Sequence, residues 1–146
     1  MCLVTFLAAD DGAQRWRRSF PGEPGEASNA RRFVATLLDD CPCLDEVLMA
    51  TGELVVNALR HTKSGGPGGR FTVEVGRSGR LVGVAVTDQG GPSEPSVVVA
   101  GEMDETGRGL RMVSTMATGW GWFGNEHART VAAVFAAPGV SWVAAA

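Results

Sequence analysis

The sequence predicts an α+β fold, a two-layer sandwich in which a mixed or antiparallel sheet is covered on one face by helices. Segments with strand patterns and helix patterns fall in separate runs along the chain, which is typical of this class. The chain has 146 residues, of which 45% are hydrophobic and 20% are charged, as in ordinary globular proteins. We therefore expect one domain that spans residues 1–146.

Six short segments carry the patterns of β-strands. Residues 71–75 alternate between apolar and polar side chains, as a half-buried strand does. Residues 81–86 are almost continuously apolar, so we expect them in the centre of the sheet, after a hairpin turn at 77–80. The other expected strands lie at 1–9, 15–20, 120–123 and 130–136, the last two forming a closing hairpin.

Three further segments are expected to form helices. The first runs from about residue 30 to 39, because apolar residues recur there every three or four positions. Ser28 or Asn29 can cap its start. The second helix runs from 44 to 61, and the third, which follows a Gly-Arg-Gly sequence, runs from 110 to 116.

The charge pattern excludes several functional classes. The net charge is −3, so we expect no direct contact with nucleic acid. The only lysine, Lys63, follows Thr62 rather than a glycine, which excludes a P-loop for nucleotide phosphates. Because Lys63 also lies outside any apolar strand, it does not match the lysine of eukaryotic-type protein kinases.

The cysteine content and the hydropathy are those of a cytoplasmic protein. An odd number of cysteines, with a tight Cys41-Pro-Cys43 pair, does not indicate a secreted disulfide framework, and a zinc site would lack two further ligands. The apolar residues 1–9 lack a positively charged segment and indicate a strand rather than a signal peptide. No stretch approaches the roughly 20 apolar residues of a membrane span, so we expect no membrane contact.

A row of polar residues interrupts the apolar coat of the helix expected at 44–61. Glu53, Asn57 and His61 recur every four positions, which places them on one face, and Arg60 lies beside them. An ionised carboxylate buried without a partner costs several kcal/mol. The row is therefore paired internally, or it faces a cleft filled by a polar ligand, or it is a stripe exposed to solvent.

Two glycine-containing segments are candidates for ligand contacts. Asp88 ends the most apolar strand and precedes two glycines, so its carboxylate can accept a hydrogen bond from a ligand amine or stabilise a turn. Residues 89–106 form a long loop of the kind that acts as a lid, binds ligands or is disordered. Gly107 and Gly109 precede the third helix, whose free N–H groups can bind phosphate, although Gly-x-Gly alone is also common in loops.

Taken in order, these segments resemble a known family, the histidine-kinase-like (Bergerat-fold) ATPases. GELVVNALRHT at 52–62 resembles the N box, VTDQGG at 86–91 the first glycine box, and TGRGLRMV at 106–113 the second. Within that superfamily the chain is most similar to the RsbW-like anti-sigma-factor serine/threonine kinases. The resemblance implies the Bergerat ATP-binding fold, with a core at about 20–136.

The resemblance also implies a role for individual residues. It makes Glu53 the general base, Asn57 a ligand of both Mg²⁺ and ATP, and Asp88 the acceptor of the adenine amine. The first glycine box departs from the family pattern, because Pro92 stands where its second glycine is expected. The remaining residues expected to contact ATP are Arg60, His61, Gly90, Gly107, Arg108, Gly109, Leu110 and Thr130, of which His61 and Thr130 have ordinary helix-end and strand roles as alternatives.

The function implied is that of an ATP- and Mg²⁺-dependent protein kinase in a partner-switching system. Such a kinase phosphorylates a serine of an anti-anti-sigma factor and sequesters a sigma factor when that partner is unavailable. The alternative is a regulatory module that binds ATP without significant phosphotransfer. Members of the family often form dimers, so a homodimer is a further expectation.

Overall fold

The computed structural model describes residues 13–79, 81–91 and 105–136. The strand expected at 1–9 and most of the loop expected at 89–106 lie outside these residues. The elements in chain order are β1 (Gln14–Pro21), α2 (Glu26–Leu37), α3 (Leu44–His61), the 3₁₀-helix η1 (Lys63–Gly65), β2 (Arg70–Arg77), β3 (Leu81–Asp88), α4 (Glu105–Met116), β4 (Gly119–Gly124) and β5 (Arg129–Ala136).

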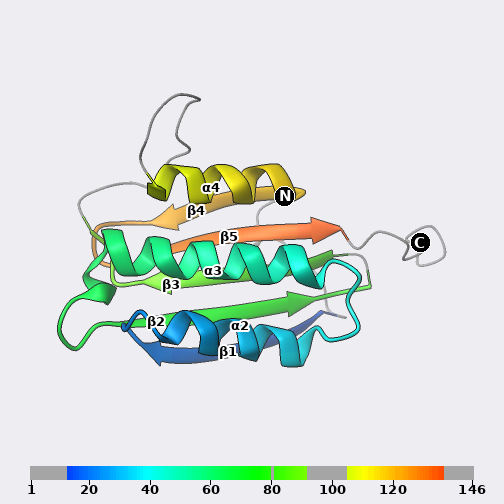
Figure 1. Ribbon diagram of the computed structural model, residues 1–146, viewed down its shortest axis with the longest axis horizontal. Coiled ribbons are helices and arrows are strands. Elements are labelled where there is room, and N and C mark those ends of the chain that lie inside the picture. Colours follow the sequence, from blue (N-terminus) through cyan, green and yellow to red (C-terminus); the bar gives the residue numbers. More distant parts are fainter. Residues whose placement is uncertain (1–12, 80, 92–104, 137–146) are drawn as a thin grey trace.

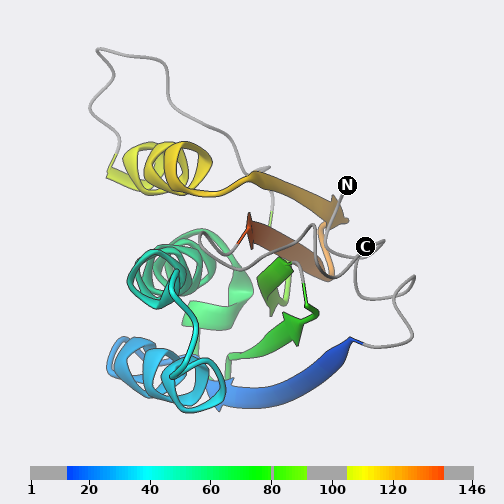
Figure 2. The same ribbon diagram turned by 90° about the vertical axis from the view of Figure 1, so that its right-hand side faces the viewer.

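The described strands form an antiparallel sheet in the order β1-β2-β3-β5-β4. The helices α2, α3 and α4 lie side by side on one face of this sheet (Figures 1 and 2). The predicted α+β class with helices on one face is therefore confirmed, and every strand pair in the described sheet is antiparallel. β3 lies in the middle of the order, as its almost continuously apolar sequence predicts.

The main hydrophobic core lies between the sheet and the helices. Phe71 and Val84 of the sheet and Leu54 and Val55 of α3 are among its fully buried members. α3 lies between α2 and α4 (Figure 2) and contacts both of them as well as β3 and β5. Because α3 packs against a helix on each side and against the sheet below it, its apolar coat is wider than that of a surface helix. No helix in the described ranges is both long and apolar enough to cross a membrane.

α2 begins four residues before its expected start. Its N-cap is Gly25, which makes no side-chain capping hydrogen bond, so the predicted cap at Ser28 or Asn29 is wrong. The backbone is already turning at this point, because the N–H of Glu26 donates to the Glu23 carbonyl at 3.0 Å. Asn29 lies inside the first turn and donates to the Glu26 carboxylate at 3.2 Å.

α4 also begins earlier than expected, at Glu105 rather than at residue 110. Gly107 and Gly109 therefore lie within the helix instead of preceding it. A helix leaves the N–H groups of about its first four residues without intrahelical partners. Gly107 belongs to that group, whereas the N–H of Gly109 falls within the regular helical pattern.

The two cysteines between α2 and α3 form a buried contact. The Sγ atoms of Cys41 and Cys43 lie 2.8 Å apart, and both thiols are free. Burial, together with the neighbouring Cys41, raises the pKa of the Cys43 thiol to about 12. A thiol with this pKa stays protonated at neutral pH and is a poor nucleophile or metal ligand.

Candidate functional site

The polar row on α3 is not uniformly exposed to solvent. Asn57, in its middle, is only 7% exposed. Glu53 and His61 are half-buried, and Arg60 is exposed. The interpretation of the whole row as a solvent stripe is therefore wrong for its centre, where an amide side chain is enclosed by the fold.

The carboxylate of Glu53 lies directly against the backbone of α4. A Cβ atom added to Gly109 would collide with Glu53 Oε2 and would lie 3.4 Å from the Glu53 carboxyl carbon. The absence of a side chain at Gly109 thus leaves room for the Glu53 carboxylate directly against the backbone of α4. The contact brings the middle of α3 together with residues 106–113, more than forty residues later in the chain.

The end of β3 forms a turn that is tied to the end of α3. The N–H of Gly90 donates to Asp88 Oδ1 at 2.7 Å, and the Gly90 carbonyl accepts from the N–H of Lys63 at 2.9 Å. Gly90 has a φ of +76°, which favours glycine. A Cβ atom on Gly91 would lie 2.5 Å from the carbonyl oxygen of His61. Residues 86–91 are thus packed against the last turn of α3.

Asp88 is a buried carboxyl group, 4% exposed. Burial raises its pKa above the ordinary value, while the Gly90 hydrogen bond and the charge of Arg129 act in the opposite direction. An ionised carboxylate can only accept hydrogen bonds. In its ionised form this buried group would find a suitable partner in a ligand with an exocyclic amine.

Arg129 is a member of this site that the sequence interpretation missed. It is the direct cross-strand partner of Asp88 and, like Asp88, is 4% exposed. Its Nη2 donates to the Gly91 carbonyl at 2.8 Å, and its guanidinium carbon lies 5.5 Å from the centroid of the Trp122 ring. The available signal was the two-residue alternation of this strand, which places residue 129 on the same sheet face as the apolar Val131.

Thr130 lies on the opposite face of the sheet. Its position alternates with those of Arg129 and Val131, and its hydroxyl oxygen is 2.8 Å from that of Thr87 on β3. The structure therefore does not bring Thr130 together with Asp88, and the expected contact with adenine does not fit this position. Its placement agrees with the alternative, an ordinary strand threonine.

The second glycine segment approaches α3 in a different way from that expected. Gly107 and Arg108 lie in the first turn of α4, and Gly109 lies against Glu53. Leu110 is 1% exposed and belongs to the core, so its side chain cannot cap a ligand. The N–H groups of this helix that can face a phosphate are those near Glu105 rather than those at 109 and 110.

The donor set on α3 fits a magnesium ion held mainly by a nucleotide. Glu53 and Asn57 supply a carboxylate and an amide oxygen one helical turn apart, and Mg²⁺ prefers oxygen ligands while keeping waters and phosphates. In the described part of the chain, no group of three or more His, Cys, Asp or Glu residues could hold a metal by itself. Asn57 therefore fits as one ligand among several, with the rest coming from phosphate and water.

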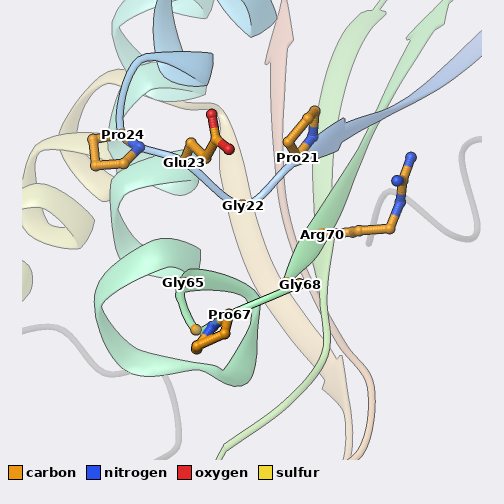
Figure 3. A pocket seen from close by; sticks show the side chains of 10 residues that line it. Pro21, Gly22, Glu23, Pro24, Gly65, Pro67, Gly68 and Arg70 are labelled. Carbon is orange, nitrogen blue, oxygen red and sulfur yellow. The ribbon is translucent and has the colours of Figure 1, made fainter.

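A separate hollow lies beside the glycine-rich segment that follows α3 (Figure 3). It has a volume of about 520 Å³ and is lined by residues 21–24 and 65–70. None of the residues expected to contact ATP lines it. This hollow is therefore distinct from the arrangement of Glu53, Asn57 and Asp88.

Comparisons with known proteins agree with this geometry. The model of the histidine kinase-like ATPase domain family matches residues 20–135, which is most of the chain. A search of curated proteins finds no match. The matched range includes α3, β3 with the turn that follows it, α4 and all but the last residue of β5, which together contain every residue of the candidate site.

Proposed function

Since the chain belongs to the histidine kinase-like ATPase domain family, we propose that it is an ATP- and Mg²⁺-dependent serine/threonine protein kinase that acts as an anti-sigma factor. Its protein substrate would be an anti-anti-sigma factor. The main observation in support of a nucleotide site is that α3 contacts both glycine segments, residues 86–91 and 106–113. Gly109 lies against Glu53, and the turn at Gly90 and Gly91 packs against the end of α3.

In this proposal each residue has a distinct task. Asp88 accepts a hydrogen bond from the adenine amine, and the Gly90 turn holds its carboxylate in place. Asn57 ligates Mg²⁺, which would neutralise charge on the transferring phosphoryl group. Arg60, exposed at the end of α3, can contact a phosphate oxygen.

Glu53 is the candidate general base. Its carboxylate would accept the proton of the substrate serine as the serine oxygen attacks the γ-phosphorus and ADP leaves. It lies one helical turn before Asn57, so base and metal ligand share one face of α3. Glu53 is half-buried, so part of its side chain remains exposed to solvent.

The partner assignment is supported by the resemblance of residues 52–62, 86–91 and 106–113 to the anti-sigma-factor kinases. A sigma factor and an anti-anti-sigma factor are accordingly the proposed binding partners. A cytoplasmic location and a homodimeric state belong to the same proposal.

Phosphotransfer to a partner tests the kinase proposal. We expect γ-labelled ATP to label a serine of an anti-anti-sigma protein from the same genome when wild-type protein is present. Glu53→Gln should lower the rate by about 100-fold or more while ATP is still bound, because general bases contribute about 10²–10⁴-fold. Met49→Ala, on an exposed part of α3, is the matched control and should transfer phosphate normally.

One observation favours the alternative, an ATP-gated binding module. The α4 backbone at Gly109 lies against Glu53 and restricts access of a serine hydroxyl to that carboxylate. If wild-type protein binds ATP but labels no partner, while ATP alters its affinity for a sigma factor, the kinase proposal is wrong and the module is the better description.

A further inference from the structure

We propose that Ser64 and Gln89 are positioning residues of the nucleotide site, which fix the direction of the Asp88 carboxylate toward the adenine amine. The inference rests on the proposed ATP site and deepens it. Neither residue contacts the nucleotide in this proposal, and both act through Asp88.

The first support is the way in which the pairing of β2 with β3 ends. Its last pair at this end is Thr72 opposite Thr87, and continuing the register by two residues places Arg70 opposite Gln89. The backbone here is bound by side chains instead of by the partner strand. The N–H of Arg70 donates to Gln89 Oε1 at 2.9 Å, and the N–H of Gln89 donates to Ser64 Oγ at 2.9 Å. Two side-chain oxygens thus satisfy the backbone N–H groups at the point where β3 leaves β2.

The second support is that Ser64 is itself held in place by α3. It is 0% exposed, and its N–H donates to Thr62 Oγ1 at 3.1 Å. The Thr62 hydroxyl in turn donates to the carbonyl of Ala58, within α3, at 2.6 Å. Cβ atoms on Gly22 and Gly69 would collide with the Ser64 carbonyl oxygen, so the neighbouring backbone packs closely around it. The Ser64 hydroxyl is therefore an acceptor whose position is set by the end of α3.

The third support is that the anchored segment is the turn that holds Asp88. The N–H of Gly90 donates to Asp88 Oδ1 at 2.7 Å, and the Gly90 carbonyl accepts from the N–H of Lys63 at 2.9 Å. Consecutive residues of η1, Lys63 and Ser64, thus bind consecutive residues of the turn, Gly90 and Gln89. A hydrogen bond weakens steeply as its angle departs from linearity, so the direction of the carboxylate decides how well it accepts a ligand amine.

A purely structural role is the alternative explanation of these hydrogen bonds. A hydroxyl that only stabilises the fold would change the free energy of unfolding and would affect the binding of every nucleotide alike. A positioning residue instead affects the single contact that Asp88 makes, and so only ligands that carry the amine. Comparing ligands with and without the amine therefore distinguishes the two roles.

The experiment measures by calorimetry the affinity of the protein for ATP and for purine riboside triphosphate, which lacks the amine, in the presence of Mg²⁺. We expect wild-type protein to bind ATP about tenfold or more tightly than the analogue, as for a hydrogen bond to a charged group. In Ser64→Ala the affinity for ATP should fall to that of the analogue, whose own affinity should stay unchanged. Gln89→Ala, which removes only the hydrogen bond to Arg70, should bind ATP about fivefold more weakly and the analogue as before.

A second background tests whether the effect passes through Asp88. In Asp88→Ala the amine has no carboxylate to bind, so the addition of Ser64→Ala should weaken ATP binding no further. Ser19→Ala is the matched control, because it also removes a hydrogen-bonded hydroxyl, 2.9 Å from that of Thr72, at an exposed position on β1. It should bind both ligands as wild type.

Each outcome decides the matter. If Ser64→Ala keeps the wild-type preference for ATP, or loses affinity for both ligands by the same factor, the inference is wrong and the proposed ATP site stands. If wild-type protein binds both ligands equally, Asp88 does not contact the amine and the inference fails, although ATP is still bound. If wild-type protein does not bind ATP, the proposed function fails and the inference fails with it. Should Ser64→Ala not fold, Gln89→Ala at its exposed position decides by the same comparison.

Discussion

Asp88 combines burial with a short hydrogen bond and a nearby positive charge. Burial is the largest influence and raises the pKa of this carboxyl group above its ordinary value. The folded state therefore holds the proton more tightly than the unfolded state does. Stability contributed by the protonated form is present at low pH and is lost as the pH rises from the unfolded value of 3.8 through the folded pKa.

This linkage gives a prediction for Asp88→Asn. The stability of the variant relative to wild type should increase as the pH rises above about 4 and then level off, because asparagine carries no titrating proton. Urea unfolding of both proteins between pH 3.5 and 8 at fixed ionic strength measures the difference. If the difference in free energy of unfolding between the two proteins does not change with pH, Asp88 has the same pKa in the folded and unfolded states, and the prediction is wrong.

Residues 129 and 130 show why the sheet face on which a side chain lies is harder to predict than the strand itself. Composition and alternation predict a strand at 130–136, and the structure contains β5 from Arg129 to Ala136. Which of two adjacent residues faces the site depends on the pairing register, and a shift of one residue reverses every side chain. Arg129 lies on the site face for this reason, and Thr130 lies on the other.

At the scale of elements, the second helix could be predicted well and the other two less well. α3 has the expected limits, because its apolar periodicity is long and acidic residues occupy its first turn. α2 and α4 begin earlier than local capping rules indicate. Turn hydrogen bonds to the carbonyls of Glu23 and Pro24 begin α2 early. In α4, Gly109 lies against Glu53 of α3, and neither kind of contact can be predicted from a short segment.

The packing of α4 on α3 predicts the effect of Gly109→Ala. Alanine favours a helix interior by about 1 kcal/mol over glycine. The new methyl group collides only with the end of the flexible Glu53 side chain, which can move aside. We therefore expect the free energy of unfolding to remain unchanged or to rise by up to about 1 kcal/mol, while phosphotransfer falls because the carboxylate is displaced.

Urea unfolding and the labelling assay test this prediction together. Ser114→Ala, at a partly buried position elsewhere in α4, is the control for helix propensity alone and should leave phosphotransfer intact. A destabilisation of Gly109→Ala by more than about 1 kcal/mol would mean that Glu53 cannot move. Unchanged phosphotransfer would mean that the position of its carboxylate does not matter.

At the scale of the whole molecule, the order of the elements positions the site. The antiparallel order β1-β2-β3-β5-β4 brings the end of β3 beside the start of β5, and α3 lies across them between α2 and α4 (Figures 1 and 2). Segments near residues 57, 88 and 109 meet for this reason. The sequence predicts these three segments, but their mutual contacts follow only from the topology.

The most direct test of this account is calorimetric titration of Asn57→Ala with ATP and Mg²⁺. Asn57 is enclosed in the middle of the polar row and fits the metal–triphosphate through its amide oxygen. The account predicts that binding falls by at least 100-fold while the circular dichroism spectrum is unchanged, with Met49→Ala binding as wild type. Unaltered ATP affinity in a folded Asn57→Ala protein would contradict the assignment of the nucleotide site to this face of α3.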